Sequence, residues 1–329
     1  MLPAVLFKAI APANRLALDF DTPCEPLKES TMKMENPTRI TELGGAEQLE
    51  NLILEEDGDV ALLRLNRPNV VNCLSMKLSR ELVQVFEYLR ASKTVKFVVI
   101  KGEGGNFCSG DDLKEMSLGT WGNSNEYFHQ VRYYQQMAYA LEELDKITIS
   151  AVDGYAVGGG LEITMATDFV IATERSQWGM PEVDWGITPG WGGTTRMARL
   201  IGRRRTKEIN ILAAIHPAKT AVEWHLWNYM CADDQLDNEV GKLLSLLRGK
   251  SQQTVRQLKY IINKGVETDL YTAQAFEALS AAWTASVNGW WEVPDADKGE
   301  GLKAFREKSG LMDERRDMAR NFWVEGKHS

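Results

Sequence analysis

The sequence predicts an α/β fold, because short apolar runs typical of buried strands alternate with amphipathic helical stretches and glycine-rich loops. Two rounds of this alternation follow one another along the first half of the chain. This alternation favours one α/β domain with right-handed connections between its strands, and it argues against separate all-α and all-β domains. With 329 residues, of which 44% are hydrophobic, the chain is long enough for a substantial core.

The first round begins with a predicted hairpin at residues 52–66, where two strand-like runs flank the turn dipeptide Asp57-Gly58. Apolar residues then recur every three or four positions over residues 75–92, which predicts an amphipathic helix with Ser75 as its N-cap. The apolar run at residues 96–101 predicts a buried strand that leads into a glycine-rich loop.

The second round contains a helical stretch at residues 127–144, a β-branched strand at residues 147–152, and three consecutive glycines, Gly158–Gly160. Glycines without Cβ atoms let the backbone approach a ligand closely. Apolar residues at 161, 165 and 169 predict a helix after the turn, whose N-terminus favours negative charge and carries Glu162 in its first turn. The spacing of a dinucleotide fingerprint or of a P-loop is not present.

Helices are predicted for most of the C-terminal part. One begins after Gly192-Gly193-Thr194 and is expected to end near Gly202, and successive helices are expected around residues 243–247, 255–262 and 273–282. We divide the chain into an N-terminal arm at residues 1–45, a core at residues 46–240 and a helical region at residues 241–329.

The arm mixes acids and prolines without a clear period, so we expect it to be disordered or to lie upstream of the natural start. It resembles neither a mitochondrial presequence nor a secretory signal. The formal charge of -8 argues against a general nucleic-acid binder. No apolar run approaches the ~20 residues that span a bilayer, and we expect no membrane association.

The four cysteines are scattered without a C-x-x-C pair, which suits reduced thiols and a cytoplasmic location. The four histidines have no metal-ligand spacing, so no metal site is expected.

Four segments, in this order along the chain, resemble the crotonase, or enoyl-CoA hydratase/isomerase, superfamily. They are LNRP and NCLS within residues 65–75, FCSGDDLKEM at residues 107–116, AVDGYAVGGGLEITMATD at residues 151–168, and WGMPEVDWGITPGWGGTTRM at residues 178–197. No single motif is decisive, but the ordered set is specific, and the resemblance covers about residues 50 to 310.

This resemblance implies a superhelix of repeated ββα units, followed by a helical C-terminal region that packs between subunits of a homotrimer or homohexamer. It implies an enoyl-CoA hydratase, a hydro-lyase that adds water across the α,β double bond of an acyl-CoA thioester. Coenzyme A would be part of the substrate, and no other cofactor is expected.

The resemblance also assigns site residues. The backbone N–H groups of Asp111 and Gly159 would form an oxyanion hole for the thioester oxygen, where negative charge develops in the enolate. Glu162 would activate water, and Glu182 would exchange a proton with Cα. Taken alone, Glu162 could be a dipole-stabilised helix residue and Glu182 a surface acid. Asp112 is interpreted as structural.

Tryptophans could wall an aromatic or alicyclic acyl pocket. Candidates are Trp178 and Trp185, which flank Glu182 together with Trp191, and the C-terminal Trp290 and Trp291. Such residues are more often core or interface residues. The segment around Glu182 also resembles hydroxycinnamoyl-CoA hydratase-lyases, which cleave a C–C bond after hydration.

Two alternatives therefore stay open: a hydratase-lyase or other crotonase for bulky acyl-CoA, and a non-catalytic crotonase-fold binding protein. One feature departs from the family pattern, since Asn69, Val70 and Val71 stand where a basic residue often contacts CoA phosphates. Arg203–Arg205, Lys303 or Arg306 are candidate replacements.

Overall fold

The computed structural model describes residues 31–41, 43, 49–117, 122–287, 310, 314–319 and 322. A seven-stranded sheet forms its centre, in the order β1-β2-β3-β4-β5-β7-β10. The first three strands pair antiparallel, and β3 to β10 pair parallel. The strands are β1 (Thr38–Ile40), β2 (Leu52–Asp57), β3 (Val60–Leu65), β4 (Phe97–Gly102), β5 (Ile147–Val152), β7 (Phe169–Thr173) and β10 (Tyr229–Cys231).

The hairpin and the helix predicted for the first round are both confirmed. Asp57 pairs with Val60 across the turn, and Gly58 takes the left-handed conformation with φ 59° that such a turn favours. Helix α1 (Met76–Ala91) follows, and the side chain of Ser75 caps it by accepting a hydrogen bond from the N–H of Leu78.

Helices cover both faces of the sheet, so its parallel strands are buried on both sides. Side chains on one face, such as Val98 and Ile100, join a core that also contains residues of α1, α3 (Ser124–Glu142) and α4 (Gly159–Met165). On the other face, Phe97 and Val99 pack in a second core with α7 (Leu236–Arg248). The alternation of strand side chains produces this division.

A second, three-stranded sheet places the glycine turn beside the segment that carries Glu182. Strand β6 (Tyr155–Val157) pairs parallel with β8 (Gln177–Gly179), which pairs antiparallel with β9 (His216–Pro217). The N–H of Gly158 donates to the carbonyl of Gly179 at 2.9 Å. The chain then enters the short 3-10 helix η3 (Glu182–Trp185).

The helix after the glycine turn is shorter than its apolar spacing predicts. It ends at Met165, and Phe169 begins strand β7 instead of a further turn. The cause is tertiary: the Asp168 carboxylate accepts hydrogen bonds from the N–H and hydroxyl of Thr148, at 2.8 and 2.9 Å, which holds the chain beside the start of strand β5. The spacing of apolar residues along the sequence contains no information about this contact.

Helix α5 (Thr195–Leu212) passes the point where it was expected to end. Gly202 has φ 77° and ψ 159°, so it interrupts the helical backbone, and the chain resumes a helix beyond it. The expected end near Gly202 is therefore a break between two helical stretches. The other short helices are η1 (Pro68–Val70), η2 (Glu103–Gly105), α2 (Leu113–Ser117) and α6 (Ala218–Glu223).

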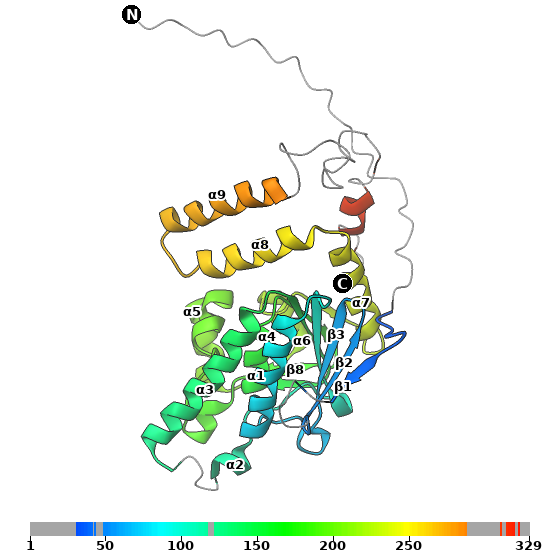
Figure 1. Ribbon diagram of the computed structural model, residues 1–329. Helices are drawn as coiled ribbons and strands as arrows, with labels where there is room; N and C mark the ends of the chain where they lie inside the picture. The colour runs from blue at the N-terminus through cyan, green and yellow to red at the C-terminus, as the bar shows by residue number, and fades with distance from the viewer. Residues whose placement is uncertain are drawn as a thin grey trace, which may run out of the picture.

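The three helices predicted toward the C-terminus are present as α7, α8 (Gln252–Gly265) and α9 (Leu270–Val287). Figure 1 shows α8 and α9 side by side, with α9 on the outer side of α8. Lys259 of α8 reaches into the protein, and its ammonium group donates to Asp168 at 2.8 Å and to the carbonyl of Lys146 at 2.9 Å. This buried contact holds α8 against the segments that lead into β5 and β7.

The arm predicted for residues 1–45 lies mostly outside the described residues. Its described part belongs to the sheet, since β1 pairs antiparallel with β2 and Met32 and Met34 pack on the second core. No helix in the described ranges is both long and apolar enough to cross a membrane.

Candidate active site

Two glycine-containing loops lie in direct contact. Cys108 donates its N–H to Tyr155 and accepts from the N–H of Val157, at 2.8 and 3.0 Å, so the first loop is held along strand β6. A Cβ atom on Gly160 would lie 2.2 Å from the carbonyl oxygen of Cys108. The close approach of the two backbones therefore requires glycine at this position.

The backbone N–H groups of Asp111 and Gly159 lie on these two loops. A Cβ atom on Gly110 would be 3.2 Å from the Gly159 nitrogen, which shows how closely the loops approach. Hydrogen bonds from Leu74 to Gly110 and from Asp112 to Leu74 fix the backbone on either side of Asp111. Among the described residues, neither the Asp111 nor the Gly159 N–H has an acceptor, so both are available to a ligand oxygen.

Glu162 is 1% exposed, in the first turn of α4. Its Oε1 accepts hydrogen bonds from the N–H groups of Trp191 at 3.0 Å and Gly193 at 2.6 Å. Burial raises the pKa of Glu162 to about 8, against the lowering effect of those two amides, and the charges of Asp111 and Glu182 raise it further. The two hydrogen bonds to Oε1 thus fix the side chain, and Oε2 can bind a ligand.

Glu182 begins η3, and its side chain reaches the same glycine turn. Its Oε1 lies 3.0 Å from the position that a Cβ atom on Gly158 would take. Its Oε2 is buried without a hydrogen-bond partner, and burial raises the pKa of Glu182 to about 7. A buried carboxyl without a partner is costly unless a ligand or water completes its bonding.

Asp111 contributes a third carboxyl that sequence reasoning missed, because the resemblance assigned only its backbone. Its Oδ1 is buried without a partner and lies 3.0 Å from the Cβ position of Gly159. The one available signal was an acid in the middle of a glycine-rich loop. The neighbouring Asp112 is structural, as interpreted: it pairs with Arg67 at 2.9 Å and accepts from the N–H of Glu115.

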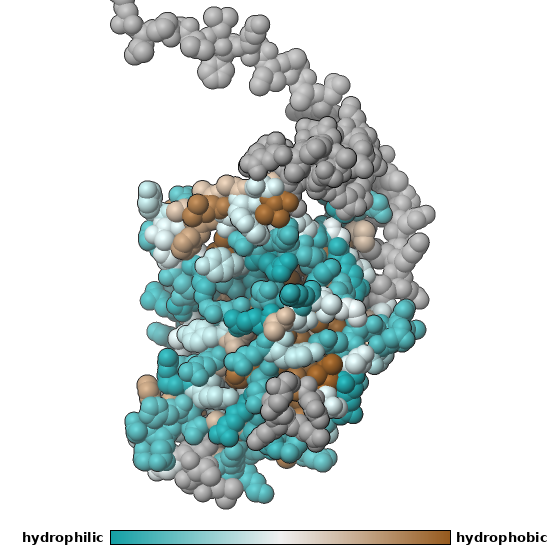
Figure 2. All heavy atoms as spheres, in the orientation of Figure 1, coloured by the Kyte–Doolittle hydropathy of each residue, from teal (hydrophilic) through white to brown (hydrophobic). Residues whose placement is uncertain are grey.

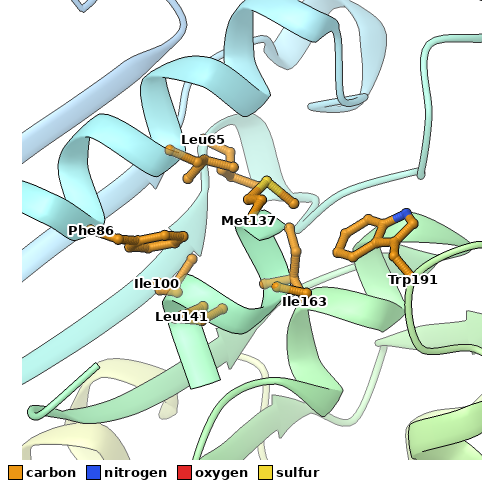
Figure 3. Close-up of a pocket in the computed structure, with 9 residues that line it drawn as sticks. Leu65, Phe86, Ile100, Met137, Leu141, Ile163 and Trp191 are labelled. Carbon is orange, nitrogen blue, oxygen red and sulfur yellow. The ribbon is translucent and has the colours of Figure 1, made fainter. Parts of the chain in front are cut away.

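Trp191 was named from the sequence as a tryptophan that flanks Glu182, but it was not assigned to the site. Its ring edge lies 2.8 Å from the Gly159 Cβ position, and the ring stacks on Tyr134 with centroids 5.8 Å apart. The same ring closes one end of a small apolar cavity, opposite Phe86, with Ile163 between them (Figure 3).

The proposed tryptophan pocket is not supported by the positions of its described members. Trp178 is fully buried, donates its indole N–H to the carbonyl of Pro217 and packs against Trp224 and Trp227, because β8 directs it into the core. Trp185 is 63% exposed on η3. Trp290 and Trp291 lie outside the described residues.

The sequence profile described as "Enoyl-CoA hydratase/isomerase" matches residues 55–312. The chain is 32% identical over 260 residues to the crotonyl-CoA hydratase of Syntrophomonas wolfei, covering 79% of this chain and 96% of that protein. It is 33% identical over 271 residues to the short-chain-enoyl-CoA hydratase of Clostridium acetobutylicum, with coverage of 79% and 96%. The crystal structure of an enoyl-CoA hydratase from Bacillus anthracis superposes with a TM-score of 0.71 at 30% identity, covering 79% and 97%.

Proposed function

Because the chain belongs to the enoyl-CoA hydratase/isomerase family, we propose that it adds water across the α,β double bond of an acyl-CoA thioester. The observation that carries this proposal is the meeting of two unpartnered backbone N–H groups with the buried Glu162 and the partly buried Glu182 at one glycine turn. Relatives that are named as hydratases support the same reaction. The coenzyme would enter only as part of the substrate.

The N–H groups of Asp111 and Gly159 would hold the thioester oxygen. When water attacks Cβ, electron density moves to this oxygen as an enolate forms, and two fixed donors stabilise that charge without reorganising. Gly159 opens helix α4, so its N–H also carries the positive end of the helix dipole.

Glu162 and Glu182 would complete the addition. The oxygen of water bonds to Cβ while Glu162, as the carboxylate, takes the proton of that water. Glu182, as the carboxylic acid, gives its proton to Cα, and the net transfer from one glutamate to the other is reversed before the next turnover. The pair thus needs one proton between two acids. Both pKa values are raised toward neutral pH, to about 8 for Glu162 and about 7 for Glu182, so the free site favours the proton on Glu162, and it must pass to Glu182 before water is added.

A spectrophotometric assay tests this function directly, because hydration removes the conjugated double bond of crotonyl-CoA or cinnamoyl-CoA and lowers the absorbance. Loss of absorbance with formation of a 3-hydroxyacyl-CoA supports the proposal. No turnover with any enoyl-CoA of a chain-length series contradicts it.

The two alternatives receive no support from the relatives reported above, which are named as hydratases. A hydratase-lyase would release an aldehyde from a feruloyl-type thioester, and detection of only the hydroxyacyl product rejects that cleavage. A non-catalytic binding protein would bind acyl-CoA without turnover.

A homotrimer or homohexamer remains our proposal for the assembly. Apolar side chains are exposed on α9, and Figure 2 shows them gathered along that helix. The residues are Leu270, Leu279, Trp283 and Val287. Light scattering after size-exclusion chromatography gives the subunit number, and a monomer at assay concentrations contradicts this assembly. A cytoplasmic location is likewise proposed, and the free, buried thiols of Cys73, Cys108 and Cys231 are compatible with it.

A further inference from the structure

We propose that the side chain of Asp111 is a third acid of the active centre, which works in its neutral form and donates a hydrogen bond to the substrate oxygen held by the Asp111 and Gly159 amides. This inference rests on the proposed function, and it assigns to the side chain a role beyond that of its own backbone.

The geometry places the carboxyl group beside Gly159, whose N–H is one of the two donors. Asp111 Oδ1 and the edge of the Trp191 ring both lie within about 3 Å of one point, the Cβ position of Gly159. One methyl group of Leu74, Cδ1, lies 3.0 Å from the same point. The Oδ1 atom is buried and has no partner among the described residues, so it is a polar atom that a ligand would satisfy.

Charge then decides the protonation state. An ionised Asp111 would face a developing enolate oxygen, and two like charges in close proximity repel strongly where the effective dielectric constant is low. The guanidinium of Arg67 does not relieve this, since it is bound to the adjacent Asp112. A neutral carboxylic acid removes the repulsion and supplies an O–H donor, as an apolar site allows in another enzyme.

The titratable groups around Asp111 act in the same direction. Burial raises the pKa of Asp111 to about 7, and the charge of Glu182 is the second cause. No cation is among the described groups that shift this pKa. The groups coupled to Asp111 from the neighbouring elements are Glu182, Glu162, Tyr127, Tyr134 and Cys108.

Two variants separate a neutral donor from a carboxylate. Asp111→Asn keeps the size and a donor but cannot ionise, and Asp111→Ala removes the donor. We expect Asp111→Asn to retain hydratase activity at pH 6 and, because Glu182 still loses its proton near pH 7, to decline less steeply than the wild type as pH rises further. Asp111→Ala should lower kcat on the order of 10²-fold, the loss typical of one oxyanion donor.

Asp112→Asn is the matched control, because it alters the adjacent acid that pairs with Arg67. It should keep the wild-type pH profile, whatever its effect on stability. Circular dichroism and thermal melting verify that each variant folds. An Asp111→Asn variant as inactive as Asp111→Ala overturns the proposal, because the carboxylate would then be required. Full activity of Asp111→Ala, or an unchanged high-pH decline in Asp111→Asn, also overturns it.

Infrared difference spectroscopy tests the protonation independently of turnover. The wild type should show a carbonyl band of a protonated carboxylic acid that disappears as pH is raised from 5 to 9, and Asp111→Asn should lack that component. If the wild type hydrates no enoyl-CoA, the proposed function fails, but this band still decides whether Asp111 is neutral. Identical spectra of wild type and variant contradict the neutral acid.

Discussion

Glu162 accepts a hydrogen bond of 2.6 Å from the backbone N–H of Gly193, 31 residues further along the chain. Together with the N–H of Trp191, this bond holds one carboxyl oxygen in place while the side chain stays almost fully buried. The loop at residues 191–193 therefore positions the acid of helix α4, and it does so with backbone N–H groups.

The raised pKa of Glu162 predicts that this group makes the fold less stable as pH increases. Its pKa is about 8 in the folded chain and about 4.3 when unfolded, so the folded state binds more protons between these values. The penalty is absent below the unfolded pKa and complete above the folded pKa. Glu162→Gln should stabilise the protein relative to wild type by an amount that increases from pH 5 to pH 9, on the order of 1 to 3 kcal/mol.

Urea unfolding at several pH values measures this difference. A stability difference that is constant across the range contradicts the raised pKa of Glu162. The protein should be compared at one subunit concentration, because association also changes apparent stability.

The contact between the two glycine loops predicts that Gly160→Ala is harmful. The new methyl group would meet the backbone oxygen of Cys108 at 2.2 Å, so one loop must move, at a cost of about 1 to 3 kcal/mol. Hydratase activity should decline with it, since the same shift separates the two oxyanion donors.

Gly265→Ala is the control for this substitution. A Cβ atom there would lie 3.7 Å from the Cβ of Ala273, an ordinary contact, and alanine favours a helix over glycine by about 1 kcal/mol. Thermal melts of the two variants should therefore move in opposite directions. Equal effects would mean that the loop contact has no special importance.

The buried ion pair between Lys259 and Asp168 predicts a large cost for Lys259→Met. The variant would leave the Asp168 carboxylate without its cation, which typically costs about 3 to 5 kcal/mol for a fully buried pair and somewhat less at this partly exposed carboxylate. Lys264 lies on the same helix as Lys259 and forms an exposed ion pair with Glu143. Lys264→Met removes that pair and should cost less than about 1 kcal/mol. A Lys259→Met variant as stable as Lys264→Met would contradict the conclusion that the Lys259–Asp168 pair holds α8 in place.

Local sequence patterns predicted the elements whose causes are local. The turn at Gly58, the Ser75 cap and strand β5 follow from turn chemistry, capping and β-branched composition. The predicted end of α4 was wrong, because the Asp168 carboxylate accepts a hydrogen bond from Thr148, 20 residues away in the sequence. No pattern indicated this bond.

The candidate site divides in the same way. Glu162, Glu182 and the glycine loops were assigned by ordered motifs, and the structure brings them to one turn. The Asp111 side chain and Trp191 were not assigned, because their importance depends on which atoms face Gly159 after folding. Trp178 was chosen because it is a tryptophan close to Glu182 in the sequence, but its strand directs the side chain into the core.

The most direct test of the account is the hydration rate of crotonyl-CoA with wild type, Glu162→Gln and Glu182→Gln, with folding verified for each. The wild type should hydrate the substrate, and each variant should lower kcat on the order of 10² to 10⁴-fold, because each removes an acid–base group from the proposed addition. Hydration by both variants at the wild-type rate would contradict the roles assigned to the two glutamates.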